Sequence, residues 1–265
     1  MNKFSIYFYY FNVIKNNFDY KSTIDNFLSF SDEVVCATIP GEDDTVFELK
    51  KLADKHKSFR VIETDISLSN NRFDGMLKTV ALEKTTNPIK IIADGDERFA
   101  LSNKGAWERA AQQLMETRYD GLLIPSVDLW GDETKIRLNQ PIGQKFRMHK
   151  STIVKRGVVP YAEKPNGLFD TTMSDSTEPL KSDGQLGTFA SLADSFQLQP
   201  VNSFTLKTLP YVLHYGYVDL AQRAKINKDF WKKHWENRSG REENVVTDLD
   251  ILLKDKTMMH QIPLK

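Results

Sequence analysis

Residues 89–98 read Ile-Lys-Ile-Ile-Ala-Asp-Gly-Asp-Glu-Arg, an apolar run that ends in two carboxylates separated by one glycine. The run has the β-branched composition of a buried strand, and the Asp94-Gly95-Asp96 turn follows where that strand would end. Two carboxylates so close together repel each other unless a cation neutralises them. Hard divalent ions can do so, because they bind carboxylate and substrate phosphate oxygens together. A plain polar turn would use the same residue types. The place of this turn in the fold therefore decides between the two interpretations.

The sequence before this turn alternates between strand-like and helix-like segments. Strands are expected at residues 4–11, 33–39, 59–63 and 89–93, and helices at residues 20–30, 45–56 and 71–84. This order predicts an α/β, Rossmann-like fold with a mostly parallel central sheet and helices on both faces. Ligands of such sheets bind at the carboxyl ends of the strands, where the Asp94-Gly95-Asp96 turn falls. That position favours the metal site.

The pattern changes after a helix expected at residues 103–116. Further strands are expected at 121–130, 134–138 and 144–149, and helices at 188–196 and 220–235. Residues 157–187 are rich in Gly, Pro, Ser, Thr and Asp, which predicts an irregular segment. Loops of this length are usually functional or mobile. The second half is therefore expected to form a subdomain built onto the first.

Composition limits the classes of protein. Lys and Arg total 36 and Asp and Glu total 36, so the net charge of zero argues against a nucleic-acid partner. The single cysteine, Cys36, lies in an apolar stretch, which indicates a buried residue and a reducing compartment. Neither a membrane-spanning run nor a signal peptide is evident in the sequence. We therefore expect a cytoplasmic protein.

Together these segments resemble family 2 glycosyltransferases of the GT-A fold, which carry an Asp-X-Asp turn after a strand of a parallel α/β half. The resemblance covers roughly residues 4–235 and is strongest over 4–100. Three further segments agree with it: Phe11-Asn12, Pro40-Gly41-Glu42-Asp43-Asp44-Thr45 and His214-Tyr215-Gly216-Tyr217. The chain departs from the family at Thr38 and Ile39, near which an aspartate is common. It also lacks the Gln-X-X-Arg-Trp segment of the processive members.

The resemblance implies a metal-dependent enzyme of glycan biosynthesis that moves a sugar from a nucleotide-diphosphate donor, with UDP-sugars favoured, to a glycan, lipid or other hydroxyl acceptor. Residues 1–118 would form the nucleotide-sugar-binding half and 119–265 the acceptor-side half of one continuous domain. The implied ligands of Mn²⁺ or Mg²⁺ are Asp94, Asp96 and His214. The donor-binding residues would be Phe11, Asn12, Thr38, Asp43, Asp44, Arg72, Lys78, Asp94 and Gly95.

An inverting transfer also needs a carboxylate that takes the proton of the acceptor hydroxyl. The stretch Ser174-Asp175-Ser176-Thr177-Glu178 is densest in acids and hydroxyls, so we expect Asp175, and next Glu178, as the base. The basic helix at 220–235 would either close over the nucleotide or touch an anionic membrane surface. The alternative functions are a metal-dependent phosphatase or nucleotidyltransferase that uses the same Asp pair, and a non-catalytic carbohydrate-binding protein.

Overall fold

The computed structural model describes residues 3–69, 73–137, 144–158, 177–185, 187–191, 209–232, 249 and 259–261. The expected alternation in the first part is confirmed. In chain order the elements are β1 (Phe4–Tyr10), α1 (Tyr20–Phe30), β2 (Glu33–Thr38), α2 (Thr45–Lys55), β3 (Phe59–Glu63), α3 (Phe73–Glu83) and β4 (Ile89–Ile92).

Shorter strands dominate the rest of the described chain. They are β5 (Glu97–Phe99), β6 (Gly121–Asp128), β7 (Lys135–Arg137), β8 (Gln144–Lys150), β9 (Ile153–Val158), β10 (Thr177–Lys181), β11 (Phe189–Ser191), β12 (Val212–His214) and β13 (Met259–Gln261). The helices are α4 (Lys104–Glu116), after a short 3₁₀ turn, and α7 (Leu220–Ile226), which continues as a π-helical turn over Asn227–Trp231.

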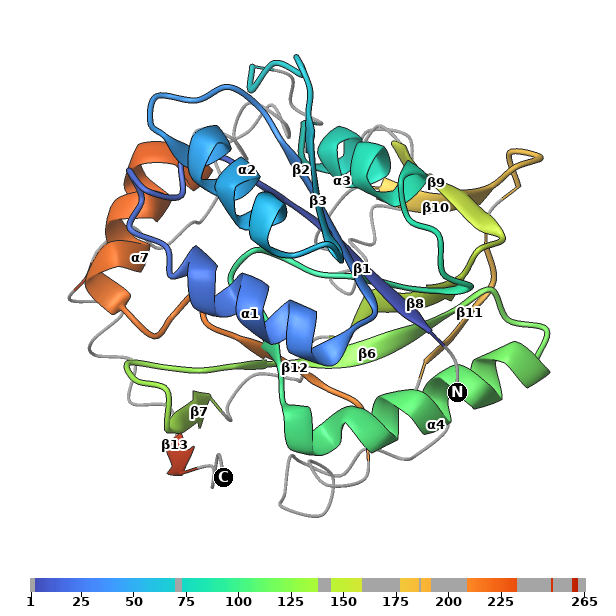
Figure 1. Cartoon of the computed structure of the whole chain (residues 1–265). Coiled ribbons are helices and arrows are strands. Elements are labelled where there is room, and N and C mark those ends of the chain that lie inside the picture. Colours follow the sequence, from blue (N-terminus) through green and yellow to red (C-terminus); the bar gives the residue numbers. More distant parts are fainter. Residues whose placement is uncertain are drawn as a thin grey trace.

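Nine described strands form the central sheet (Figure 1), in the order β3-β2-β1-β4-β8-β6-β12-β5, with β11 also paired to β6. β1, β2, β3 and β4 pair in parallel, as β6 does with β11 and β12. β8 runs antiparallel between β4 and β6, and β5 runs antiparallel to β12. The predicted α/β fold with a mostly parallel central sheet is therefore confirmed, and strands from both halves of the chain share that sheet.

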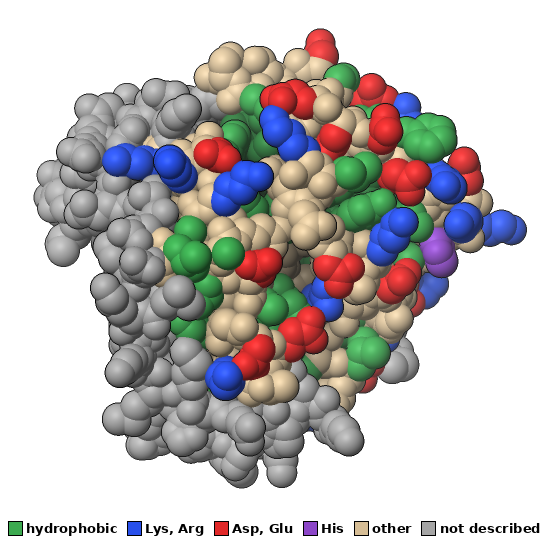
Figure 2. Space-filling view, turned by 90° about the vertical axis from the view of Figure 1, so that its left-hand side faces the viewer, with side chains coloured by type: hydrophobic (Ala, Val, Ile, Leu, Met, Phe, Trp, Pro, Cys, Tyr) green, Lys and Arg blue, Asp and Glu red, His purple; other side chains and the backbone are tan. Residues whose placement is uncertain are grey.

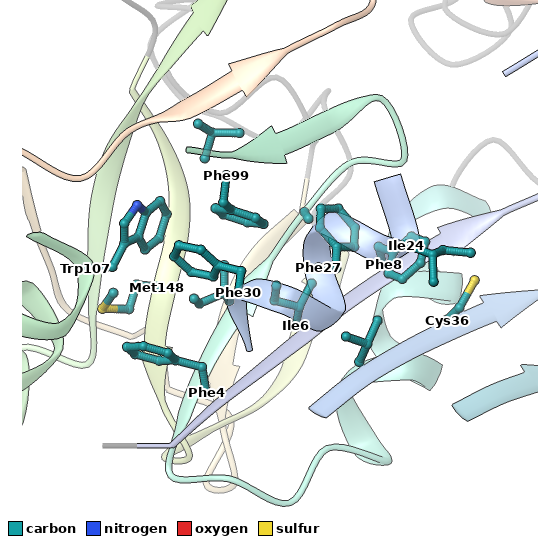
Figure 3. Close-up of a cluster of buried hydrophobic side chains, with 14 of the residues drawn as sticks. Phe4, Ile6, Phe8, Ile24, Phe27, Phe30, Cys36, Phe99, Trp107 and Met148 are labelled. Atoms are coloured by element: carbon teal, nitrogen blue, oxygen red, sulfur yellow. The ribbon is translucent and has the colours of Figure 1, made fainter. Parts of the chain in front are cut away.

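The core follows from the alternation of side chains along β1, whose successive residues point to opposite faces of the sheet. Phe4, Ile6 and Phe8 pack with α1, α2 and α4, whereas Tyr7 packs on the α3 side. Helices thus cover both faces. Figure 3 shows the first of these clusters with Cys36 inside it, and the expected burial of this cysteine is confirmed.

Two expectations about the second half are wrong. Part of the stretch expected to be irregular forms β10, which pairs with β9 as an antiparallel ribbon. Within the expected helix at 188–196, residues Phe189–Ser191 instead form β11, and residues 192–196 lie outside the described part. β11 pairs with Gly121–Leu123 of β6, and this long-range pairing outweighs the weak local pattern of a three-residue segment.

Figure 2 shows the side of the molecule that lies on the left in Figure 1. Acidic and basic side chains are intermingled over its described surface. This distribution agrees with the net charge of zero. Among the described helices, none is long and apolar enough to cross a membrane.

Candidate metal centre

Sheet pairing brings the Asp94-Gly95-Asp96 turn to His214. The turn joins β4 to β5, and β12 lies between β5 and β6, so that His214 pairs with Glu97 on one side and Asp128 on the other. The backbone N–H of Tyr215 donates to the carbonyl of Asp96 at 2.7 Å. As a result, Nε2 of His214 lies 3.2 Å from Oδ2 of Asp96, although the two residues are 118 positions apart in the sequence.

The other ring nitrogen of His214 faces a second carboxylate. Nδ1 lies 2.7 Å from Oδ1 of Asp128, the last residue of β6. Burial by itself would lower the pKa of His214, but the carboxylates of Asp96 and Asp128 outweigh it and raise the pKa to about 10. Burial would raise the pKa of Asp96, but His214 and Arg223 lower it to about 2. Without an ion, the two carboxylates therefore favour a protonated His214 between them, and an ion bound at Nε2 would replace the Nε2 proton.

The carboxylate of Asp94 faces a different group of charges. It lies 2.5 Å from Nζ of Lys78 and 3.5 Å from Nη2 of Arg147, and Arg147 is also bonded to Glu97. Lys78 and Arg147 are 2% exposed and Glu97 is fully buried, so two cations balance two anions behind the turn. The two aspartates of the motif are thus separated: Asp94 is held from the interior and Asp96 faces His214.

Two glycines in the predicted motifs are required by close contacts. A Cβ atom on Gly95 would lie 2.1 Å from the ring of Tyr10, whose hydroxyl donates to the Gly95 carbonyl. A Cβ atom on Gly216 would lie 2.6 Å from Nε2 of His214 and 2.7 Å from Oδ2 of Asp96. The backbone at Gly216 therefore forms one wall of the space between these two side chains.

The loop after β1 is tied to the acidic turn after β2. Oδ1 of Asn12, a residue with a positive φ of 48°, accepts a hydrogen bond from the N–H of Glu42 at 2.8 Å. The two carboxylate oxygens of Asp43 accept from the N–H groups of Lys15 and Thr45. Asn12 and Asp43 thus fix the shape of this edge of the sheet, and their contact with a nucleotide stays a prediction.

The remaining predicted residues are distributed around this edge or lie outside the described chain. Phe11 packs against Phe73 and Phe230, with ring centroids 5.5 and 5.3 Å away. Thr38 is buried, and its hydroxyl has no hydrogen-bond partner among the described residues. Asp44 is exposed at the start of α2. Those outside the description are Arg72, Asp175 and the side chain of Glu178.

Three residues of this region were not predicted from the sequence: Asp128, Arg147 and Arg223. Asp128 could have been considered, because it lies near the end of the strand expected at 121–130, just as Asp94 follows the strand expected at 89–93. Arg147 and Arg223 stand among other basic residues, and the sequence offers no signal that separates them from a solvated surface.

The donor atoms of Asp96 and His214 fit a divalent ion. They are close enough for one ion to contact both, and a carboxylate oxygen with an imidazole nitrogen is a ligand pair that Mn²⁺ accepts. Among the described residues, no group of three His, Cys, Asp or Glu side chains is arranged to hold a metal ion. An ion here would therefore take its remaining ligands from water and from substrate oxygens, as Mg²⁺ commonly does.

No model of a known protein family matches the chain, and no curated protein matches it. Among solved structures, the mannosyltransferase PcManGT from Pyrobaculum calidifontis, in complex with GDP-Man and Mn²⁺, is similar with a TM-score of 0.46 and 12% identity. That match covers 95% of this chain and 68% of PcManGT. The S. aureus TarS 1–349 complex with UDP gives a TM-score of 0.41 and 15% identity, covering 91% of this chain and 76% of TarS 1–349.

A third similar structure is the 4-diphosphocytidyl-2C-methyl-D-erythritol synthase from Anaerococcus prevotii, with a TM-score of 0.33 and 8% identity. It matches 56% of this chain and 70% of its own. In another crystal structure of TarS 1–349, the match covers 48% of that chain, so this protein spans about half of its length. Since all of these TM-scores lie below 0.5, the activity proposed below rests on the residues of this chain.

Proposed function

We propose that this protein is a metal-dependent glycosyltransferase that moves a sugar from a nucleotide-diphosphate donor to a hydroxyl group of an acceptor. The observation that carries the proposal is the 3.2 Å approach of His214 to Asp96 at the carboxyl edge of the sheet. Both residues belong to segments that resemble glycosyltransferase motifs, and they come from distant parts of the chain. If the Asp94-Gly95-Asp96 turn only ended a strand, its contact with the His214 segment, 118 positions away, would not be expected.

Each residue of the centre has a role in this proposal. Asp96 and His214 would hold Mn²⁺ or Mg²⁺, which as a Lewis acid neutralises the leaving nucleoside diphosphate. Asp128 accepts the Nδ1–H of His214 and so leaves Nε2 to face Asp96, the arrangement that usually orients a metal-binding histidine. Asp94 is held by Lys78 and is a quarter exposed, so one edge of its carboxylate can accept hydrogen bonds from a donor ribose.

The donor would lie over the edge formed by the Asn12 loop, the acidic turn and the Asp94-Gly95-Asp96 turn. We place donor binding in residues 1–118 and acceptor binding in 119–265, as parts of one continuous domain. The proton acceptor for an inverting transfer stays assigned to Asp175, with Glu178 as the alternative. Contact of the basic C-terminal helix with a membrane surface is a secondary part of this proposal.

A nucleotide-release assay with added Mn²⁺ tests the function. The purified protein is incubated with UDP-, GDP-, TDP- and CMP-sugars, including UDP-GlcNAc and GDP-Man, and the released nucleotide is measured. We expect release from one donor, stopped by a chelator and reduced about 100-fold or more in Asp96→Asn, since the carboxylate that holds the ion is lost. Asp54→Asn, which changes an exposed aspartate of α2, is the matched control and should keep full activity.

Other outcomes separate the alternatives. Release of inorganic phosphate from a phosphorylated substrate, with every nucleotide sugar left intact, would indicate a phosphatase. Formation of a nucleotide sugar from a nucleoside triphosphate and a sugar 1-phosphate, with release of pyrophosphate, would indicate a nucleotidyltransferase. Saturable sugar binding that is the same for the wild type and for Asp96→Asn, without turnover, would indicate a binding protein. Each of these results contradicts the proposed transferase.

A further inference from the structure

The helix α7 lies against the edge of the sheet that carries the candidate metal centre. Nε2 of Gln222 donates to the carbonyl of Asn16 and, at 2.9 Å, to that of Asn17, so α7 is fixed to the loop that follows β1. Figure 1 shows α7, in orange, beside this blue segment. At the far end of the helix Phe230 packs on Phe11. These contacts hold α7 in one position relative to the site.

The next residue, Arg223, directs its guanidinium toward Asp96 of the candidate metal centre. Nη1 of Arg223 lies 3.8 Å from Oδ2 of Asp96, and the guanidinium carbon lies 4.6 Å from the ring centroid of Tyr217. The side chain is only 18% exposed, and its buried Nε–H has no hydrogen-bond partner among the described residues. A charge-assisted hydrogen bond between these groups would measure about 2.7–2.9 Å, so at 3.8 Å the contact with Asp96 is a long ion pair and not a hydrogen bond.

Other cations near the turn have closer carboxylate partners. Lys78 contacts Asp94 at 2.5 Å, and Arg98, which also stacks on a tyrosine, contacts Asp19 at 2.7 Å. Arg223 differs because its ion pair with Asp96 is long, at 3.8 Å, while its guanidinium carbon lies over the ring of Tyr217. A planar guanidinium matches the oxygens of a phosphate, which it can bind through two parallel hydrogen bonds.

From these contacts we infer that Arg223 binds the diphosphate of the donor beside Asp96, and that α7 holds it there. The inference deepens the proposed function and rests on it. The guanidinium would neutralise part of the negative charge of the phosphates next to Asp96. Arg223 would thus bind the donor, whereas Gln222 and Phe230 on either side of it hold the helical segment in place.

The test compares affinities for diphosphate and nucleoside by isothermal titration calorimetry. UDP, GDP, CDP and dTDP are titrated with Mn²⁺ present, and the corresponding nucleosides serve as ligands without phosphate. For the nucleoside diphosphate that the wild type binds, we expect Arg223→Ala to bind about 10- to 100-fold more weakly, the usual effect of losing hydrogen bonds to a charged group. Affinity for the matching nucleoside should stay unchanged, and Arg223→Lys should fall between.

Lys225→Ala is the matched control, because Lys225 is an exposed cation two residues further along α7. It should bind the diphosphate like the wild type. Mn²⁺ alone, titrated without nucleotide, should bind Arg223→Ala at least as tightly as the wild type. The positive charge of Arg223 near Asp96 repels the metal ion, and the variant removes that repulsion. A residue that only shaped the Asp96 pair would instead weaken Mn²⁺ binding when removed.

Three results would overturn the inference in different ways. If the wild type binds no nucleoside diphosphate with Mn²⁺, the proposed function fails together with it. If the wild type binds one and Arg223→Ala matches Lys225→Ala, the inference alone is wrong. If Arg223→Ala loses Mn²⁺ and diphosphate affinity equally, Arg223 positions the metal pair. Thermal unfolding of each variant, with Arg223→Lys as the conservative replacement, identifies any loss that comes from misfolding.

Discussion

Nδ1 of His214 lies 2.7 Å from Oδ1 of Asp128, on the opposite side of the imidazole ring from Asp96. Because His214 is the last residue of β12 and Asp128 the last of β6, their pairing is fixed by the register of two parallel strands. The sheet therefore sets the orientation of the ring, and the ring sets which nitrogen faces Asp96. This relationship makes Asp128 as important to the centre as the residues that would contact the ion.

Replacing Asp128 should weaken metal binding without removing a metal ligand. We expect Asp128→Asn to bind Mn²⁺ about 10- to 100-fold more weakly, since the amide does not fix the ring or raise its basicity as the carboxylate does. Titration of Mn²⁺ into the purified variants measures this effect. Asp54→Asn serves again as the exposed control. Equal affinity of Asp128→Asn and the wild type would show that the hydrogen bond to Nδ1 does not contribute.

Gly216 should be more sensitive to substitution than its place in a turn indicates. In Gly216→Ala the added methyl group would meet His214 and Asp96 at less than 3 Å, so one of them must move. We expect this variant to lose Mn²⁺-dependent stabilisation in a thermal-shift measurement while remaining folded. Gly105→Ala is the matched control: its methyl group would meet only Arg109, at 3.5 Å, within α4.

The control variant Gly105→Ala should keep its response to Mn²⁺ and gain stability. Gly105→Ala removes a glycine from a helix and is expected to stabilise the protein by up to about 1 kcal/mol, with the Mn²⁺ response unchanged. Retention of the full Mn²⁺ response by Gly216→Ala would mean that the two side chains tolerate the methyl group. The closeness of the backbone at this position would then have no consequence for the site.

The interior ion pair of Lys78 and Asp94 should be strongly coupled. Lys78→Met leaves the carboxylates of Asp94 and Glu97 to share the guanidinium of Arg147, and we expect it to lower the free energy of unfolding by about 2–4 kcal/mol, because one buried cation no longer balances them. Adding Asp94→Asn should recover part of that loss. Urea unfolding of both single variants and the double variant gives the coupling energy. Additive effects would contradict a direct interaction.

Asp120, just before β6, contacts Thr188 and Lys181, and these contacts should make the stability of the protein depend on pH. Its carboxylate, 8% exposed, accepts from the N–H and hydroxyl of Thr188 at 2.9 Å and lies 3.1 Å from Nζ of Lys181. Burial would raise the pKa of Asp120, but these bonds lower it from 3.8 to about 2. Asp120→Asn should therefore cost about 1–3 kcal/mol at pH 7, where the wild-type group is ionised.

The sign of the pH dependence follows from that lowered pKa. The stabilisation is fully present above the unfolded value of 3.8 and is lost as the pH falls through about 2. The difference in urea midpoint between the wild type and Asp120→Asn should accordingly be constant from pH 7 to about 5 and shrink below pH 4. A difference that grows on acidification would contradict the assigned shift.

Local sequence patterns were sufficient for the first part of the fold. The predicted bounds of α1 and β3 agree with the structure, and those of α2 differ by one residue, because apolar periodicity and turn residues are strong there. Six of the described strands were not predicted: β5, β9, β10, β11, β12 and β13. These short strands form because a partner strand offers its edge, and three to six residues carry too weak a periodicity to reveal that locally.

For the site, the sequence by itself determined the chemical types: the two aspartates after β4, the acidic turn after β2 and a late histidine. The resemblance implied that Asp94, Asp96 and His214 share one ion, but only the tertiary structure decided that His214 meets Asp96 while Asp94 contacts Lys78, because β12 lies between β5 and β6. The interior cations that hold Asp94 likewise come from α3 and β8. The contacts of His214 with Asp96 and of Arg147 with Asp94 depend on strand order and register, which the periodicity of a segment does not encode.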